Sequence, residues 1–210
     1  MALIHAATLS PSKLEMLAAW LPSQQWFDGP ASSEVEIKGA FRFDDPAGAV
    51  GVETFIVSSG GRVFQVPLTY RGNALAGGEG SLVTTMEHSV LGTRWVYDAV
   101  GDPVYAQALT TAIITGGTQA DLTFDYSAPP EKLEVTTRVA GTGNGASPAP
   151  LVDHVTVSLV GTTSTIATDG FQIEVFRLPA TAIEQSGRQH LTGTWPGQAD
   201  PLLLAAALPN

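Results

Sequence analysis

The chain has 210 residues, 44% of them apolar, which is enough for a substantial core in one domain or in one domain with a small appendage. The 20 acidic residues outnumber the 10 basic ones, and a formal net charge of −10 would be repelled by phosphate backbones, so we expect no nucleic-acid binding. The absence of cysteine excludes disulfides and thiolate metal sites.

No segment of the sequence has the length and polarity expected of a membrane or secretory element. Residues 1–11 have neither the basic leader nor the long apolar run of a signal peptide. The apolar run Leu202–Leu208 is far shorter than the roughly 20 residues that span a bilayer. We therefore expect a soluble, cytoplasmic protein that does not associate with membranes.

The first predicted element is a helix that follows Ser12. Ser12 and Glu15 have the spacing of a capping box, and Pro22 would end the helix. Its expected apolar stripe consists of Leu14, Leu17, Ala18 and Leu21.

Three strands are predicted next, over Val35–Phe43, Val52–Val57 and Arg62–Tyr70. The segment Ser58–Gly61 between the last two is typical of a hairpin turn. Apolar residues alternate along one face of the third strand, and Pro67 within it removes a backbone donor. The proline therefore predicts an edge strand or a bulge.

A second helix is predicted after a further hairpin. Residues 81–100 predict two strands around Leu91-Gly92. Asp102 followed by Pro103 has the pattern of an N-cap and a first helical residue, and Gly116 would end the helix. The expected apolar stripe consists of Tyr105, Ala108, Leu109, Ala112 and Ile113.

The remaining strands are predicted on either side of a linker rich in glycine and proline. They cover Asp121–Tyr126, Lys132–Val139, Val152–Val160, Ser164–Thr168 and Phe171–Leu178, and the C-terminal tail could add one or two more. The linker, GTGNGASPAP, has no periodicity and no bulky apolar residue. We therefore predict an α+β domain over 1–140, a linker over 141–150 and a small β subdomain over 151–210, with mostly antiparallel strands.

Five segments, in this order, resemble the N-terminal cap of actinobacterial maltokinases. They are LPSQQWFDG at 21–29, RVFQVPLTY at 62–70, VYDAVGDPVYAQAL at 96–109, ADLTFDY at 120–126 and FQIEVFR at 171–177. The resemblance implies a stand-alone cap-like protein with a curved antiparallel sheet and two helices, similar to cystatin-like folds. It also implies a small antiparallel sheet after the cap, similar to the start of a kinase N-lobe.

The last of these segments departs from what a kinase requires. In such kinases a lysine at the position of Glu174 would pair with the nucleotide phosphates. At about 5 Å and an effective dielectric near 20, each unit pair is worth roughly 3 kcal/mol, so a carboxylate there swings the interaction by about twice that. No HGD-like or HRD-like catalytic loop follows in the sequence. We therefore expect no kinase activity and no cofactor.

The densest group of polar and aromatic residues lies in Met86–Pro103, MEHSVLGTRWVYDAVGDP. The expected ligand or partner contacts in it are Glu87, His88, Arg94, Tyr97 and Asp98. A structural interpretation is also open: aromatic packing with an Arg–Asp pair at the edge of a sheet. A catalytic triad that includes both His88 and Ser89 is disfavoured, because neighbours on a strand point to opposite faces.

Two other patterns in the sequence do not predict sites. Gly141, Gly143 and Ala146 match part of a dinucleotide fingerprint, but Pro148 and Pro150 follow where a helix must begin. The four histidines are dispersed along the chain, so no metal site is predicted.

These observations lead to one main functional hypothesis and two alternatives. The main one is a non-catalytic interaction or regulatory module, which the resemblance links to trehalose, maltose or glycogen metabolism. Its implied partner is a kinase-like or trehalose synthase-like protein. The first alternative is a protein that binds a sugar or sugar phosphate, or an accessory subunit of a kinase. The second is an enzyme that uses acids of the Met86–Pro103 segment.

Overall fold

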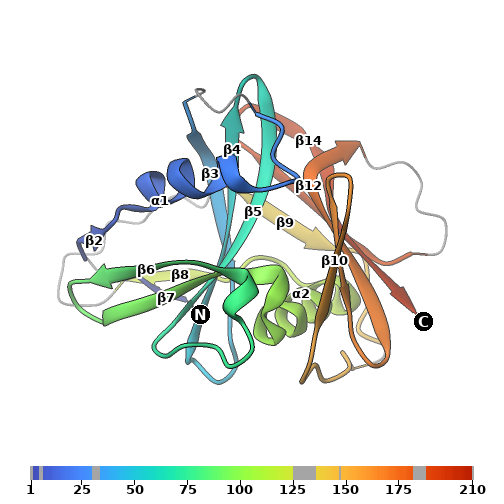
Figure 1. Cartoon of the computed structure of the whole chain (residues 1–210). Coiled ribbons are helices and arrows are strands. Elements are labelled where there is room, and N and C mark those ends of the chain that lie inside the picture. The colour runs from blue at the N-terminus through green and yellow to red at the C-terminus, as the bar shows by residue number, and fades with distance from the viewer. Residues whose placement is uncertain are drawn as a thin grey trace.

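The structure is a computed structural model that describes residues 2–4, 7–29, 34–124, 136–146, 148–181 and 188–209. Within these ranges it contains two six-stranded antiparallel sheets, two α-helices and one short parallel pair of strands, β1 (Ala2–Ile4) and β8 (Leu122–Phe124) (Figure 1). The predicted α+β, mostly antiparallel fold is confirmed. No helix in the described part of the chain is long and apolar enough to cross a membrane.

The first sheet is curled and holds strands from the N-terminal half of the chain (Figure 1). It consists of β2 (Leu9–Ser10), β3 (Glu36–Phe43), β4 (Val50–Ser59), β5 (Arg62–Arg71), β6 (Leu82–His88) and β7 (Gly92–Asp98), in the spatial order β2-β6-β7-β5-β4-β3. The predicted hairpin between β4 and β5 is confirmed. Gly60 and Gly61 at its turn have φ angles of 59° and 79°, which favour glycine.

The prediction drawn from Pro67 is wrong. β5 lies inside the sheet between β7 and β4, and its ladder with β4 runs from end to end without a bulge. β7 pairs with β5 only over Leu68–Arg71, so Pro67 precedes the paired stretch. The proline is tolerated because the ladder to β7 does not need its missing N–H.

Helix α1 (Lys13–Trp20) and the 3₁₀ turn η1 (Leu21–Ser23) cover one face of this sheet, which we call the α1 face. The capping box is confirmed: Ser12 N donates to Glu15 Oε2 at 2.8 Å, and Glu15 N donates to Ser12 Oγ at 3.3 Å. The predicted apolar stripe is only partly correct, because Leu14 is 45% exposed and Ala18 is exposed. The helix instead packs on the sheet through Met16, Leu17 and Leu21.

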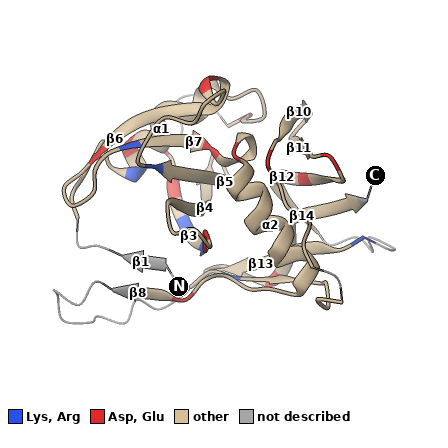
Figure 2. Cartoon of the chain, turned by 90° about the horizontal axis from the view of Figure 1, so that it is seen from below, with Lys and Arg blue, Asp and Glu red and all other residues tan. Residues whose placement is uncertain are grey.

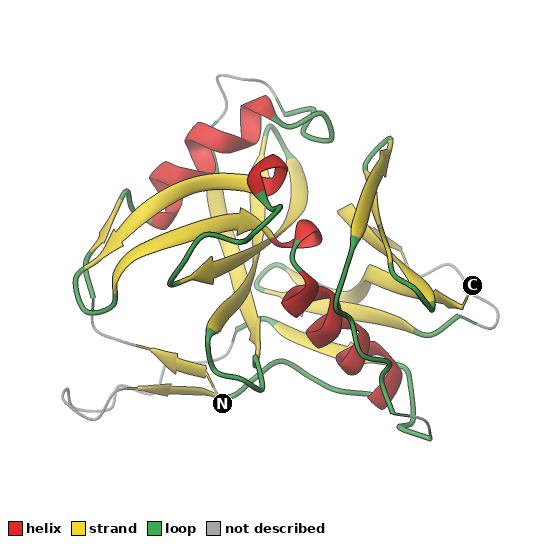
Figure 3. Ribbon diagram, turned by 60° about the horizontal axis from the view of Figure 1, so that its bottom comes forward, coloured by secondary structure: helices red, strands yellow, loops and turns green. Residues whose placement is uncertain are grey.

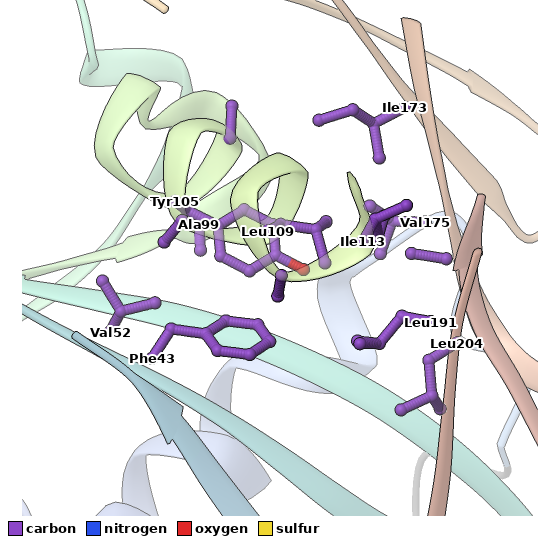
Figure 4. Close-up of a cluster of buried hydrophobic side chains, with 14 of the residues drawn as sticks. Phe43, Val52, Ala99, Tyr105, Leu109, Ile113, Ile173, Val175, Leu191 and Leu204 are labelled. Carbon is purple, nitrogen blue, oxygen red and sulfur yellow. The ribbon is translucent and has the colours of Figure 1, made fainter. Parts of the chain in front are cut away.

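Helix α2 (Pro103–Thr115) lies between the two sheets (Figures 3 and 4). The 3₁₀ turn η3 (Ala99–Gly101) directly precedes it, and another, η2 (Glu79–Ser81), precedes β6. Its predicted start, end and apolar stripe are confirmed: Asp102 Oδ1 accepts from Val104 N at 2.9 Å, and Gly116 has a φ of 70°. The helix packs against apolar residues of both sheets, among them Phe43, Val52, Ile173 and Leu204 (Figure 4).

Asp102 also joins α2 to the first sheet. Arg71 donates to both of its carboxylate oxygens, from Nε at 2.7 Å and from NH2 at 2.6 Å, and Thr69 Oγ1 donates at 2.7 Å. The Asp102 carboxylate is fully buried, and both of its oxygens accept hydrogen bonds from side chains of β5. One residue therefore fixes the start of α2 against the middle of the sheet.

The second sheet is built mainly from the C-terminal part of the chain. It consists of β9 (Arg138–Gly141), β10 (Thr156–Val160), β11 (Thr163–Ala167), β12 (Phe171–Thr181), β13 (His190–Trp195) and β14 (Gln198–Pro209), in the spatial order β10-β11-β12-β14-β13-β9. The three predicted runs and the two strands in the tail are confirmed. Residues 125–135, which include parts of two predicted strands, lie outside the described residues. The division of the chain into domains stays a prediction.

A buried arginine on β12 connects the two sheets. The side chain of Arg177 is 1% exposed, and its NH2 donates to Asp98 Oδ2 on β7 at 2.7 Å. Its Nε donates to Ser164 Oγ at 2.9 Å, and its guanidinium lies 4.5 Å from the ring centroid of Trp26. Arg177 is therefore held on the α1 face by the Asp98 carboxylate and the Trp26 ring. Through this side chain β12 packs against the first sheet.

Replacing Arg177 with methionine is expected to destabilise the fold by about 3–5 kcal/mol, because the Asp98 carboxylate would stay buried without its partner. Urea denaturation followed by circular dichroism measures this loss. The matched control is Arg188→Met, which removes an exposed pair with Glu174 and should cost less than about 1 kcal/mol. Equal losses for the two variants would contradict the structural role given to Arg177.

Candidate functional site

The five residues predicted as ligand or partner contacts all lie on the β6–β7 hairpin, but they occupy both of its faces. In the ladder Met86 stands opposite Arg94, and Glu87 stands opposite Thr93. Alternation along the strands therefore places His88, Arg94 and Asp98 on the α1 face and Glu87 and Tyr97 on the other. The two groups cannot form one contact surface.

All five are engaged with other residues of the protein. The Glu87 Oε1 atom accepts from Thr93 Oγ1 at 2.8 Å on the exposed side of the hairpin. The buried Tyr97 hydroxyl accepts from Leu75 N at 2.8 Å. Asp98 is held by the buried arginine of β12. Contact between these residues and a ligand stays a prediction.

His88 and Arg94 line a cavity of about 440 Å³ on the α1 face, which we call the α1 cavity. It lies between the N-terminal end of α1 and the first sheet, and Figure 2 shows acidic and basic segments in this region. Its charged and polar side chains are those of Lys13, Arg42, Asp44, Asp45, Glu53, Tyr70, His88 and Arg94. The volume falls within the range of small-molecule sites.

Glu53 forms the charged centre of this cavity. It is 6% exposed, accepts from Lys13 Nζ at 2.9 and 2.7 Å on its two oxygens, and accepts from Arg42 Nε and NH2 at 3.3 and 3.2 Å. Burial alone would raise the pKa of Glu53, but the charges of Lys13 and Arg42 and their hydrogen bonds outweigh it and hold that pKa below its usual value. The carboxylate therefore stays ionised and orients two cations.

Two buried polar atoms on the lining lack a hydrogen bond of good geometry within the described structure: the Tyr70 hydroxyl and Arg94 Nε. Burial, followed by the charge of the nearby Glu53, raises the pKa of Tyr70 well above its usual value, so the phenol stays a donor. Arg94 is anchored through NH2, which donates to Leu91 O at 2.7 Å. The Tyr70 hydroxyl has the Glu53 carboxylate as its acceptor, so Arg94 Nε is the buried donor on the lining that has no partner among the described residues.

The local backbone fixes the tautomer of His88. Its Nδ1 accepts from the N–H groups of Val90 and Leu91 at 3.2 and 3.1 Å. The neutral ring therefore carries its proton on Nε2 and is a donor there. The turn of the hairpin thus helps to orient His88.

The charged and phenolic groups of the α1 cavity are already engaged with one another. Its carboxylate at Glu53 is saturated by cations, and its tyrosine stays protonated, so neither group is poised as a base or nucleophile. The lining carries both charge signs in equal number, with Lys13, Arg42 and Arg94 beside Asp44, Asp45 and Glu53. Among the described residues no group of three His, Asp or Glu side chains is arranged to hold a metal ion.

The sequence analysis missed Lys13, Arg42, Glu53 and Tyr70. A signal was present for two of them: Arg42 and Glu53 are single charges inside the apolar strand segments FRF and VET. Their direct opposition across β3 and β4 depends on the strand register, which a single sequence does not provide. Lys13 joins them only because α1 crosses the sheet at this point.

The position that the resemblance gives to a kinase lysine lies within the second sheet. Glu174 on β12 stands between Thr165 of β11 and Ala206 of β14. Its side chain is 28% exposed, and Oε2 lies 3.4 Å from Arg188 NH1. The structure therefore places a paired carboxylate at this position.

Comparison with known families matches residues 20–102 to the maltokinase N-terminal cap domain. The matched residues run from the end of α1 to the cap of α2 and include strands β3–β7, so they contain most of the α1 cavity but not Lys13. This match confirms the resemblance predicted from the sequence over that part of the chain. No curated protein matches the chain.

The depressed pKa of Glu53 predicts a pH-dependent stability. The carboxylate stabilises the folded state above its ordinary pKa of 4.5, and this contribution is lost as the pH falls through the lower folded value. Glu53→Gln should therefore cost about 1–3 kcal/mol near neutral pH, and the difference from the original chain should shrink in acid. Urea denaturation across this range measures it.

The matched control is Glu36→Gln. This substitution removes an exposed carboxylate that pairs with Lys38 on the same edge strand, β3. It should have little effect at any pH. A constant Glu53→Gln difference down to strongly acidic pH would contradict the ion-pair assignment.

Proposed function

Starting from the maltokinase cap match over residues 20–102, we propose that this chain is a non-catalytic binding module built on that cap. The observation that carries the proposal is the carboxylate of Glu174, at the place where the resemblance has a phosphate-binding lysine. At about 5 Å and an effective dielectric near 20, a carboxylate repels each phosphate charge by roughly 3 kcal/mol. The module acts by association rather than by phosphoryl transfer.

The cap match also directs the proposal toward a pathway and a partner. We place the protein in the cytoplasm, in trehalose, maltose or glycogen metabolism, with a kinase-like or trehalose synthase-like protein as its partner. The support for this step is the family match alone. An accessory subunit of a kinase is one form that such an association would take.

A second candidate function is small-molecule binding. The α1 cavity favours it, because its volume suits a small ligand and its lining combines charged side chains of both signs with apolar ones. The two candidate functions are compatible, because they rest on different parts of the fold. Small-molecule binding rests on the α1 cavity of the first sheet, and the non-catalytic role rests on Glu174 of the second sheet.

The purified chain is expected neither to hydrolyse ATP with magnesium nor to phosphorylate maltose, because Glu174 repels the phosphates. A coupled ADP assay measures turnover, and radiolabelled ATP measures transfer. Magnesium-dependent turnover that Glu174→Ala changes, by a rise or a fall, while Gln172→Ala at an exposed neighbour on β12 leaves it unchanged, would overturn the proposal. The paired variants separate intrinsic activity from a contaminant.

Mixing the purified chain with a purified maltokinase or trehalose synthase is expected to give a complex of defined mass. Size-exclusion chromatography with light scattering measures the mass. If both candidates elute separately from the chain at concentrations well above a micromolar dissociation constant, the proposed partner class is wrong.

A further inference from the structure

We propose that the outer edge of β10 is an interaction surface on which a second copy of this chain pairs, with the two β10 strands antiparallel. This inference goes beyond the proposed function and does not depend on it. It follows from three features of β10: the backbone groups that it leaves open, the lack of any feature that protects an edge strand, and the complementarity of the strand to itself.

β10 is an uncovered end of the second sheet. Among the described residues it pairs with β11 alone, and Figure 2 shows β10 outside β11 and β12. Four of its five residues are exposed, and the other, Leu159, is half-buried. The remaining edges of the two large sheets are covered or short. Ala120 N donates to Arg42 O of β3 at 2.8 Å, residues 117 and 118 pair with β9, and β2 has only two residues.

The strand register shows which backbone groups of β10 face outward. A two-residue turn joins β10 to β11, so Val160 and Thr163 on either side of it form a hydrogen-bonded pair. Hydrogen-bonded pairs recur at every second residue of an antiparallel ladder. The N–H and C=O groups of Val157 and Leu159 therefore point away from β11, toward the open edge.

β10 lacks the features by which edge strands usually avoid pairing. Its sequence, TVSLV, contains no charged residue and no proline, and its ladder with β11 has no bulge. The whole segment 155–168 is uncharged, although 14% of the residues in the chain are charged. An uncharged and unprotected edge is a template for a further strand.

The side chains of β10 make the strand complementary to itself. In an antiparallel pair centred on Ser158, Val157 lies opposite Leu159 of the second copy, and Val160 lies opposite Thr156 of the second copy. Val157 is 44% exposed and Val160 is 76% exposed. The pairing therefore covers both exposed valines of the strand.

Charge and closure favour a second copy as the occupant. Asp153 and Asp169 lie at the end of the β10–β11 hairpin that is away from its turn. In the antiparallel pair this acidic end lies beside the uncharged turn of the other copy, so like charges do not meet. The pairing uses the open edge of both copies, so association stops at a dimer. A contact of this size falls below roughly 1,200 Å², which is typical of transient complexes.

Sedimentation equilibrium of the full chain, from micromolar to millimolar concentration, tests the inference. We expect the mass to rise toward twice that of the monomer as the concentration increases. Added sodium chloride should strengthen the association, because it screens the repulsion between two copies that each carry a formal charge of −10. A chain that stays monomeric at millimolar concentration in salt would overturn the inference, whatever other strand the edge can bind.

Two variants of Val157 test the backbone pairing. Val157→Pro removes an N–H that points outward and keeps the ladder with β11. The melting temperature of the monomer should therefore change little, while the dissociation constant of the dimer should rise at least roughly tenfold. Val157→Ala keeps the N–H and is the matched control, with a smaller rise. Equal effects of the two variants would contradict pairing through the backbone.

Charges at Ser158 test the second copy and the register together. Ser158→Lys and Ser158→Glu each place two like charges opposite one another, so each variant alone should dimerise roughly fivefold more weakly. An equimolar mixture of the two should recover the association. Gln172→Lys, at an exposed residue of the inner strand β12, should leave the dissociation constant unchanged. A dimer that the variants at Val157 and Ser158 do not weaken, or that the mixture does not restore, would overturn the proposed pairing.

Discussion

The contact on which the rest of the structure depends is the buried guanidinium of Arg177. A charge that is 1% exposed persists only because the protein surrounds it with a carboxylate, a hydroxyl and an aromatic face. Asp98 lies on the first sheet, Ser164 on the second, and Trp26 on the segment after α1. If any of these elements moved away, the arginine would lose compensation that water could not replace. The two sheets and that segment therefore hold one arrangement.

The same contact gives a physical reason for the segments that carry the maltokinase resemblance. Trp26 belongs to LPSQQWFDG, Asp98 to VYDAVGDPVYAQAL and Arg177 to FQIEVFR. Residues far apart in the chain meet at one buried point, so their side chains are explained by packing and charge compensation. Glu174 precedes Arg177 by three residues in FQIEVFR. Its side chain lies on the other face of β12 and takes no part in this packing. A carboxylate at this position is therefore compatible with the fold.

The fold could be predicted from the sequence where local signals decide it, and not where contacts between distant residues do. The capping box at Ser12, the Gly60-Gly61 turn and the Asp102 cap act over a few residues, and all three are present. The exposure of Leu14 was not predicted, because apolar residues lie on more than one side of this eight-residue helix. Its packing against the curled sheet determines which side is buried. The α1 cavity was missed for a similar reason. Its residues come from α1 and several strands, and only the strand register brings them together.

Two groups of charged residues lie on the α1 face, one around Asp98 and Arg177 and one around Glu53. Both are ion pairs, and they differ in whether they adjoin a cavity. Arg42, Glu53, Leu68 and Asp98 stand opposite one another in a row across β3, β4, β5 and β7. At one end of the row Trp26 and Arg177 close over Asp98, so the unpaired Arg177 NH1 and Asp98 Oδ1 atoms are sealed inside the protein. The other end of the row, Arg42 and Glu53, lines the α1 cavity, where Arg94 Nε on β7 has no hydrogen-bond partner among the described residues. An unpaired polar atom in a sealed core is a cost that the rest of the fold must offset, whereas one that faces a cavity can be satisfied by a ligand. Leu68 stands between Glu53 and Asp98 in this row, so an apolar side chain separates the charged centre of the α1 cavity from the contact that joins the sheets.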